Sequence, residues 1–264
     1  MLHAFSGPEA QPPADLIDEA PIALVYDGTT HAVMLATPND LEDFAIGFTR
    51  TERISDALPP VRIVRHTIGY ECRMTLPAAD ALALRRSRRA LAGTSSCGLC
   101  GARNLAAAVR APVTVAHPAL PISADEACAA LEALRGHQPL HDRTRAAHAA
   151  ALYAPGRGML MVREDVGRHS ALDKLAGAAV RSGIALDQAV LLLTSRVSVE
   201  MVQKAAALGV ATLVAVSAPT SLAVRMANAS GITLHANARR ARCDVHPTPD
   251  GANEPRHPAQ ARVR

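Results

Sequence analysis

The sequence predicts an α/β fold in which a three-layer α/β/α domain follows a smaller α+β region. After residue 150, apolar runs of strand length alternate with segments of helical pattern. This alternation is typical of βαβ units, with helices on both faces of a mostly parallel sheet. Before residue 100, short strand candidates surround one helix. Because 49% of the 264 residues are hydrophobic, the chain has enough apolar side chains for a sizeable core.

The first region opens with a predicted β-hairpin, because two apolar strand patterns flank a turn at Asp27 and Gly28. A helix follows through Arg50, with Pro38 and acidic residues in its first turn. The strands expected in this region are residues 22–26, 31–35, 61–66 and 71–76.

The stretch 84–101 is predicted to be a mobile loop, because it joins an arginine cluster to a run rich in serine and glycine. It contains Cys97 and Cys100 and leads into an alanine-rich helical stretch at 102–110. Another helix is expected at 123–135, where Ser123 and the glutamate three residues later form a capping-box pattern.

The second region alternates strands and helices. The run 189–193 is apolar throughout, which indicates a strand buried on both faces. A helix is expected at 170–181, with Ser170 and Asp173 as a second capping box. The other expected elements are strands at 159–162, 211–216 and from 232 onward, a helix at 197–208 ending at Gly209, and a helix at 221–229 ending near Gly231.

These patterns divide the chain into four parts. We expect a flexible N-terminus at residues 1–18 and a smaller α+β subdomain at 19–110 that ends in the mobile loop with both cysteines. The α/β/α domain then spans 111–246. A tail at 247–264, dominated by Pro, Asn, Arg and Gly without periodicity, is expected to be disordered.

The composition limits the partners. The net charge of +4 suits an anionic ligand, but several arginines belong to one cluster and to the tail. Aromatic residues are not interleaved with basic ones, so we expect no nucleic-acid partner. The first residues do not form a signal peptide, and no run of 18 apolar residues spans a membrane. We therefore expect a cytoplasmic protein.

Cys97 and Cys100 form the most informative pair in the chain. The thiolate is the reactive form of cysteine, and a helix start beside the loop would stabilise it. Five cysteines cannot all pair, and a reducing cytoplasm rarely holds a structural disulfide. Redox exchange, metal binding and transport of an extra sulfur as a persulfide remain open. A closed zinc site would need a second Cys/His pair, which the sequence lacks, so we expect no resident metal.

Three polar blocks follow three of the predicted strands: residues 163–169, 194–198 and 217–221. If those strands run parallel, the blocks meet at one edge of the sheet, each at a helix start that could hold an anion. This arrangement predicts a site for a phosphate-bearing ligand. Simple helix capping would explain the serines and Asp165. It would not explain Arg168, His169 and Arg196.

The only two lysines of the chain, Lys174 and Lys204, lie within these motif blocks. Their retention in a chain so rich in arginine suggests positions that need a compact ammonium group, although chance would explain it as well.

Other chemistries are disfavoured. No nucleophile elbow supports hydrolysis, and no GxGxxG or Walker loop is present. Zinc-dependent deamination needs His/Cys-x-Glu followed by Pro-Cys-x-x-Cys. Ser96 stands in place of that proline, and no such glutamate motif precedes it.

Several motifs in the same order resemble the formate dehydrogenase accessory sulfurtransferase family, FdhD. The similarity runs from about residue 19 to 246. It rests on Ser95–Gly101, Arg163–His169 with Ala171–Lys174, Ser195–Ser198 with Glu200–Lys204, Ser217–Arg225, and Thr37–Glu42 with Gly47.

The resemblance implies a function. Members of this family take sulfur from a cysteine desulfurase and pass it to the molybdenum bis-guanine-dinucleotide cofactor, which then enters formate dehydrogenase. It further implies a cytidine-deaminase-like fold for the larger domain and a homodimer. By this resemblance Cys97 is the persulfide-bearing residue and Cys100 assists it.

The resemblance implies that the segment 237–242, which corresponds to the family's C-terminal cofactor-binding segment, binds the cofactor. Further cofactor-binding residues are expected in the three polar blocks. The expected residues are Asn237, Ala238, Arg239, Arg240, Ala241 and Arg242, together with Asp165, Arg168, His169, Ser195, Arg196, Lys204, Thr220 and Ser221.

The chain departs from the family pattern at three places. Ser170 stands where the family usually has asparagine, two glycines are missing between Thr144 and His148, and Asn237 replaces an aromatic residue. Two alternatives stay open: a non-catalytic chaperone for the cofactor, in which Cys97 is dispensable, and a thiol–disulfide or zinc module.

Overall fold

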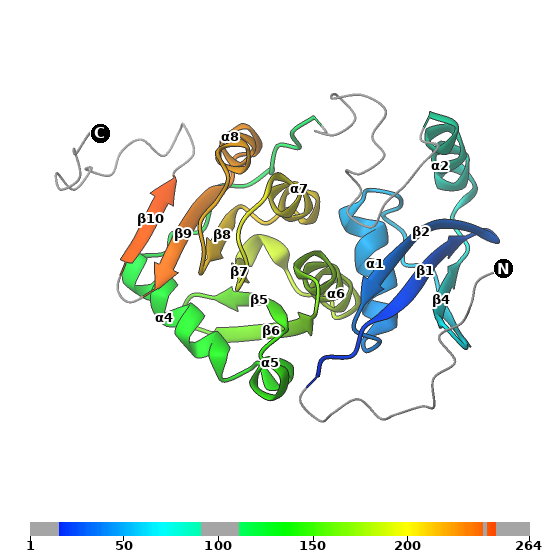
Figure 1. The fold of residues 1–264 in the computed structure, drawn as a ribbon. Helices are drawn as coiled ribbons and strands as arrows, with labels where there is room; N and C mark the ends of the chain where they lie inside the picture. Colours follow the sequence, from blue (N-terminus) through cyan, green and yellow to red (C-terminus); the bar gives the residue numbers. More distant parts are fainter. Residues whose placement is uncertain (1–15, 91–110, 240–241, 247–264) are drawn as a thin grey trace.

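The fold consists of two β-sheets with a row of helices between and around them (Figure 1). The structure is a computed structural model that describes residues 16–90, 111–239 and 242–246. Its helices are α1 (Leu41–Thr51), α2 (Ala78–Ala90), α4 (Ala124–Arg135), α5 (Pro139–Thr144), α6 (Arg168–Arg181), α7 (Val199–Leu208) and α8 (Ser221–Ser230), and a 3₁₀ turn spans Leu186–Gln188.

The first sheet has four strands in the order β2-β1-β4-β3. They are β1 (Ala20–Tyr26), β2 (Thr29–Ala36), β3 (Arg62–His66) and β4 (Gly69–Met74). Asp27 and Gly28 have φ angles of 50° and 75°, as the two central residues of a type I′ hairpin turn require. The predicted hairpin, helix and two later strands of this region are all present. One face of the sheet packs on α1, around Phe44 and Phe48.

The second sheet has six strands in the order β10-β9-β8-β7-β5-β6. They are β5 (His148–Ala154), β6 (Gly158–Asp165), β7 (Val190–Leu193), β8 (Thr212–Ala215), β9 (Thr233–Arg239) and β10 (Arg242–His246). Strands β7, β8 and β9 are parallel, while β5 and β10 pair antiparallel with their neighbours. The predicted parallel pairing is confirmed for the central strands β7, β8 and β9.

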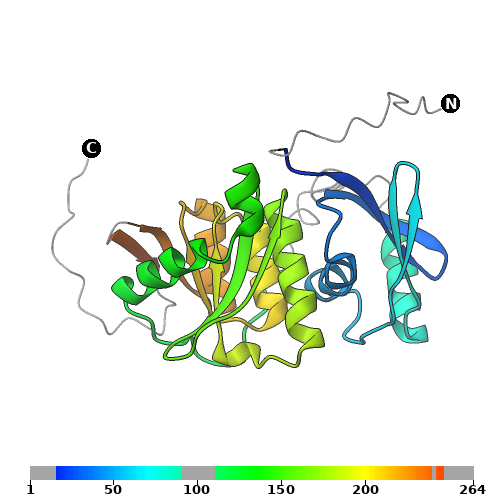
Figure 2. The ribbon, with the colours of Figure 1, turned by 90° about the horizontal axis from the view of Figure 1, so that it is seen from below.

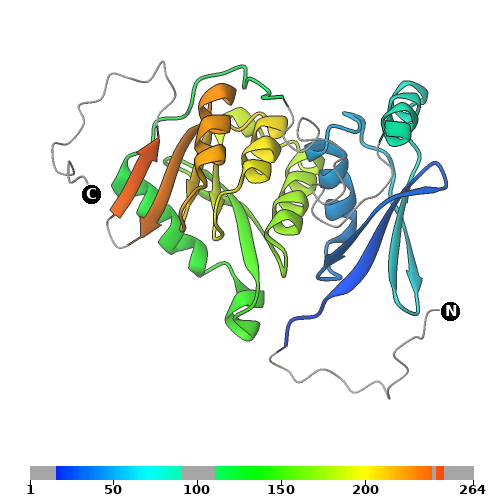
Figure 3. The ribbon, with the colours of Figure 1, turned by 45° about the horizontal axis from the view of Figure 1, so that its top comes forward.

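Helices cover both faces of this sheet, which gives the three layers that the pattern predicts (Figures 1 and 3). Leu191 and Leu193 of β7 face a core shared with α6, α7 and α8, whereas Val190 and Leu192 face a core shared with α4. Alternate side chains of a strand point to opposite faces, so a fully buried strand needs apolar residues at every position.

The two sheets are joined through α1, which packs against α6 and α7 (Figure 2). A pair of glycines permits the close approach of α1 and α6. A Cβ atom at Gly47 would lie 1.7 Å from the carbonyl oxygen of Asp173, and one at Gly177 would lie 1.9 Å from that of Asp43. No larger residue fits at either crossing point without moving a backbone. The domain boundary near residue 110 adjoins the range 91–110, outside the described residues, and stays a prediction.

Some expected elements are wrong. Residues 84–90 belong to α2 instead of a loop, because Ala, Leu and Arg are strong helix formers. Strand β5 was not expected, because His148–Ala154 is rich in alanine, which is rare in strands. Strand β10 was not expected either.

The predicted capping box at Ser170 and Asp173 is also wrong. Helix α6 begins two residues earlier, with Gly167 at its N-cap, so that Ser170 lies inside the first turn. The capping residue at Ser123 is confirmed, since its hydroxyl accepts a hydrogen bond from the backbone N–H of Glu126 at 3.1 Å. The Glu126 carboxylate accepts from the Tyr153 hydroxyl instead of closing the box.

Candidate functional site at one edge of the second sheet

The three polar blocks lie at the same edge of the second sheet, as the sequence predicts. Strand β5 is antiparallel to both β6 and β7, so β6 and β7 point in the same direction, and β7 is parallel to β8. The blocks that follow β6, β7 and β8 therefore all leave the sheet at its carboxyl edge. Ligands of α/β proteins commonly bind at this edge.

Backbone hydrogen bonds hold the second and third blocks together. The N–H of Val197 donates to the carbonyl of Ala218 at 3.3 Å, and the N–H of Thr220 donates to the carbonyl of Val197 at 3.0 Å. At the end of β9, the N–H of Asn237 donates to the carbonyl of Ser217 at 3.2 Å. The segment 237–239 thus joins the same edge, beside the third block.

Two of the three helices at this edge begin without a side-chain cap among the described residues. Helix α6 starts after Gly167, and α7 starts after Ser198, whose hydroxyl does not cap it. Helix α8 differs, because the Thr220 hydroxyl accepts from the N–H of Ala223 at 3.1 Å. The first turns of α6 and α7 therefore present N–H groups and the positive end of the helix dipole, which favour an anion.

Three buried polar atoms at the starts of these helices have no hydrogen-bond partner in the described structure. They are Nε of Arg168, Nε2 of His169 and Oγ of Ser198. Buried polar groups are almost always paired, so a cluster of unpaired ones needs an explanation. A polar ligand bound at this edge would supply the missing partners.

The histidines at this edge are held neutral. Burial, with Lys204 and Arg168 nearby, lowers the pKa of His169 to about 4. Burial and Arg168 also lower the pKa of His148, at the start of β5. A neutral imidazole can donate one hydrogen bond and accept another, so His169 can orient a ligand without adding charge.

Asp165 has protein partners on both carboxylate oxygens. Lys174 lies 2.6 Å from Oδ2, which also accepts from the N–H of Thr37, and Oδ1 accepts from the N–H of Gly167. Both Asp165 and Lys174 are 0% exposed. Asp165 therefore ties the first block to the segment before α1, and its expected contact with a cofactor stays untested.

Lys204 is buried in a second network between the two subdomains. Its ammonium group lies 2.8 Å from Asp173 and 2.8 Å from Glu52, and it donates to the Thr51 hydroxyl at 2.9 Å. Burial raises the pKa of Asp173 to about 6, while Asp173 and Glu52 outweigh burial and raise the pKa of Lys204. Lys204 thus joins α1 to the second domain, and Lys174 joins the segment before α1 to it.

The other expected residues are spread along the edge. Arg196, Thr220, Ser221 and Arg239 are exposed, whereas Ser195 is buried and donates to the carbonyl of Arg196. Ala238 is buried in the core with α4, so its side chain is not available to a ligand. Arg242 is exposed, and its guanidinium lies 3.5 Å from Asp244.

Asn237 has a φ of 52°, and its amide donates to Asp244 at 2.7 Å. Cys97, Cys100, Arg240 and Ala241 lie outside the described residues. The residues that the structure describes include no cluster of three or more His, Cys, Asp or Glu able to hold a metal ion. Within the same residues, no helix has both the length and the apolar character needed to cross a membrane.

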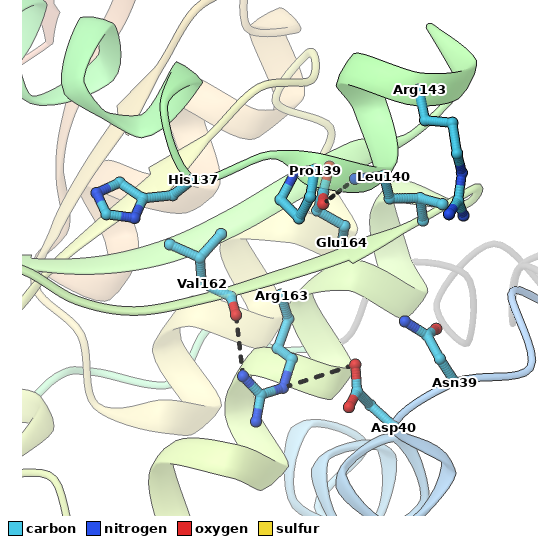
Figure 4. A pocket seen from close by; sticks show the side chains of 9 residues that line it. All are labelled: Asn39, Asp40, His137, Pro139, Leu140, Arg143, Val162, Arg163 and Glu164. Carbon is cyan, nitrogen blue, oxygen red and sulfur yellow. Dashed lines mark hydrogen bonds and ion pairs between the residues drawn. The ribbon is translucent and has the colours of Figure 1, made fainter.

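A cavity of about 330 Å³ lies where the turn before α1 meets β6 and α5 (Figure 4), and the sequence motifs do not predict it. Its lining is Asn39, Asp40, His137, Pro139, Leu140, Arg143, Val162, Arg163 and Glu164. Much of its charge is already paired. Glu164 accepts the N–H groups of Leu140 and His141, and Arg163 donates to Asp43.

Comparison with known proteins agrees with the motifs. Residues 17–251 match the model of the FdhD/NarQ family. A protein of Agrobacterium fabrum named sulfur carrier protein FdhD is 47% identical over 225 residues, which are 84% of this chain and 83% of that protein. A protein of Bordetella petrii with the same name is 45% identical over 237 residues, which are 88% of this chain and 84% of that protein.

A crystal structure from Desulfotalea psychrophila, described as a candidate formate dehydrogenase accessory protein, covers 89% of both chains with a TM-score of 0.63. Its sequence is 24% identical, so it supports the fold alone. The family model and the relatives decide the assignment: this chain belongs to the FdhD/NarQ family.

Proposed function

We propose that this protein is a cytoplasmic sulfurtransferase that passes persulfide sulfur from a cysteine desulfurase to the molybdenum bis-guanine-dinucleotide cofactor, before the cofactor enters formate dehydrogenase. Membership of the family supports the proposal, as do relatives that bear the name sulfur carrier protein. The CxxC pair lies within the matched residues.

In the first transfer, the Cys97 thiolate attacks the terminal sulfur of the persulfide on the desulfurase. A new S–S bond forms at Cys97, and the S–S bond on the desulfurase breaks with its cysteine leaving as a thiolate. The sulfane sulfur changes carriers without net oxidation or reduction.

The second transfer delivers the sulfur as hydrosulfide and needs two electrons, which Cys100 can supply. If the Cys100 thiolate attacks the inner sulfur of the persulfide, a Cys97–Cys100 disulfide forms and hydrosulfide leaves toward the acceptor. A thiol reductant then restores both cysteines.

The acceptor would dock at the carboxyl edge of the second sheet. The observation that supports this most is that buried atoms of Arg168, His169 and Ser198 have no partner in the described part of the chain. Phosphate groups of the cofactor would receive N–H bonds from the first turns of α6 and α7, and charge-assisted bonds from Arg168, Arg196 and Arg239. Asp165 and Lys204 would not contact the cofactor directly but would hold the polar blocks in position.

Intact mass measurement tests the sulfur transfer. The protein is incubated with a cysteine desulfurase and cysteine, and we expect one added sulfur atom that disappears on reduction. Cys97→Ala should lose this label. Cys128→Ala, a change at a half-buried cysteine on α4, is the matched control and should keep it.

A label retained in Cys97→Ala would overturn the assignment. Full maturation of formate dehydrogenase in cells by Cys97→Ala would instead indicate a chaperone. Stoichiometric zinc in the purified protein would indicate a metal module.

A further inference from the structure

Two cysteines outside the CxxC motif come together where α4 packs against β10 (Figure 1). Cys128 lies on α4 and Cys243 lies on β10, and both are half-buried, reduced thiols. Although they are far apart in the chain, both side chains pack against one apolar cluster, which includes Leu131 and Leu134 of α4. The remaining described cysteine, Cys72, lies in the core of the first sheet.

A hydrogen bond fixes the sulfur of Cys128 beside the backbone of Cys243. The Cys128 thiol donates to the carbonyl oxygen of Arg242 at 3.4 Å. This carbonyl belongs to the peptide bond that joins Arg242 to Cys243, so its oxygen lies about 3 Å from Cα of Cys243. The sulfur of Cys128 is therefore within about 6 Å of that Cα. Rotation of the two side chains about their Cα–Cβ bonds brings the sulfurs toward bonding distance.

The surroundings of Cys243 also point to a nearby thiol. The register of β10 on β9 shifts between Arg242 and Asp244 and so skips Cys243, as in a β-bulge. The Cys243 sulfur lies 3.7 Å from Nδ1 of His235 on β9. Burial, together with Cys128 and Asp244, raises the pKa of the Cys243 thiol to about 11. Cys128 contributes to this shift because the two thiols are close.

We propose that Cys128 and Cys243 form a redox modification site, which a low-molecular-weight disulfide such as glutathione disulfide oxidises to a reversible disulfide bond. The Cys128 thiolate first attacks the oxidant, which gives a mixed disulfide and releases one thiolate. The Cys243 thiolate then attacks the Cys128 sulfur of the mixed disulfide and releases the second thiolate. The protein thiols lose two electrons to the oxidant, and their two protons pass to the two released thiolates.

The order of attack follows from the two environments. The raised pKa of Cys243 makes it a weak nucleophile toward an oxidant in solution at neutral pH. Its attack on the mixed disulfide is intramolecular, and the high effective concentration offsets the small thiolate fraction. The pair therefore stays reduced in the absence of a disulfide oxidant and closes in two steps when one is present.

The new bond would fasten an edge strand to a helix. Strand β10 is the last strand of its sheet and pairs with β9 on one side. Arg242 ends the segment 237–242, so a bond at the next residue also holds the end of that segment against α4. Oxidation restrains β10 and reduction releases it. The inference does not rest on the sulfur-transfer proposal, because Cys97 and Cys100 take no part in it.

Peptide mapping of the full chain tests the bond. The reduced protein is incubated with glutathione disulfide, the remaining thiols are blocked with iodoacetamide, and the protein is digested without reduction. We expect a linked pair of peptides that joins Cys128 to Cys243 and separates on reduction. Blocked thiols at both positions would overturn the inference. A bond from either residue to Cys97 or Cys100, or glutathione adducts without a link, would overturn it as well.

Thermal unfolding and hydrogen exchange test the fastening of β10. In the variant Cys97→Ser/Cys100→Ser, which removes the other thiol pair, oxidation should raise the Tm by about 5–10 °C, because the bond restrains the unfolded chain. Backbone N–H groups of β10 should also exchange more slowly. Adding Cys243→Ser, a change of similar size, should abolish both effects. An unchanged Tm on oxidation, or an equal rise with Cys243→Ser, would contradict the proposal. Neither outcome affects the persulfide measurement on Cys97.

Discussion

Two regions of the molecule can be compared: the contact of α1 with α6 and α7, and the carboxyl edge of the second sheet. Both contain residues of the same motif blocks, but they differ in whether buried polar groups have protein partners. At the helix contact Asp173 and Lys204 are buried, and beside it Asp165 and Lys174 are buried against the segment before α1; each has several protein partners. At the sheet edge, Arg168, His169 and Ser198 have buried atoms without a partner among the residues that the structure describes. A motif rich in charge therefore combines residues that hold the scaffold with residues that we propose contact a ligand.

Under the proposed function, this difference separates structural from ligand-binding roles within a few residues of chain. Asp165 and Arg168 are three positions apart. Asp165 is buried in an ion pair with Lys174, whereas Nε of Arg168 has no acceptor within the described residues. Breaking a paired buried charge lowers the stability of the folded state, whereas an unpaired buried donor costs free energy unless a ligand accepts its hydrogen bond. The comparison predicts that changes at the two places will affect different measurements.

The largest effect is expected from Lys174→Met, which breaks the buried ion pair beside the helix contact. The change leaves the fully buried carboxylate of Asp165 without its counter-charge, which should cost about 3–5 kcal/mol in the free energy of unfolding. Urea denaturation measures this loss. The double variant Asp165→Asn/Lys174→Met should lose less than the sum of the two single changes, because no unpaired charge remains. An additive result would contradict a direct coupling.

The next largest effect is expected from Gly177→Ala at the crossing of α1 and α6. Alanine normally favours a helix over glycine, but here its Cβ would lie 1.9 Å from the carbonyl oxygen of Asp43. We expect a loss of about 2–3 kcal/mol in the free energy of unfolding, since the helices must separate. Gly136→Ala is the control, because its nearest atom is an ordinary contact at 3.6 Å. Equal stabilities of the two variants would refute the tight crossing.

The pH dependence of stability should reveal the neutral state of His169. Its folded pKa of about 4 lies below the 6.5 of the ordinary side chain, so the unfolded chain takes up a proton first as the pH falls. Stability is therefore lost between these two values, by about 1–2 kcal/mol from about pH 7 to about pH 5. His169→Gln should lack this part of the loss.

Unfolding of wild type and His169→Gln at both pH values measures the difference. The comparison cancels the other groups that titrate in this range, among them His148, whose pKa is also lowered by burial. His235, whose pKa burial lowers to about 4, changes stability in the same direction as His169. Asp173, whose pKa burial raises to about 6, changes it in the opposite direction. Identical pH slopes in wild type and His169→Gln would show that His169 is not held neutral.

The smallest effects separate the two kinds of helix start at the edge. Thr220→Ala removes the cap of α8 and should cost about 1 kcal/mol. Ser198→Ala removes a hydroxyl that has no partner among the described ranges, and should change stability by less than about 0.5 kcal/mol. Ser198→Ala should nevertheless weaken binding of a guanine nucleotide, measured by calorimetry. Unchanged nucleotide binding would remove Ser198 from the proposed docking site.

Local patterns were sufficient for much of the fold. The hairpin turn at Asp27 and Gly28, the capping residue Ser123 and the helix end at Gly209 depend on side chains within a few residues, and the structure contains all three. Strand β5 could not be predicted in this way. It is stabilised by pairing with β6 and β7 on both sides, which outweighs the low strand preference of its alanines.

By itself, the sequence determined the alternation of strands and helices, and with it the edge where three polar blocks meet, because hydrophobic periodicity and glycine turns are local properties. Only the tertiary structure decided which residues of those blocks are buried with protein partners and which are available to a ligand. Asp165 and Lys204 find their partners on α1 and the segment before it, more than a hundred residues away in the chain. Such distant pairing leaves no local pattern, because it depends on how two helices pack through Gly47 and Gly177.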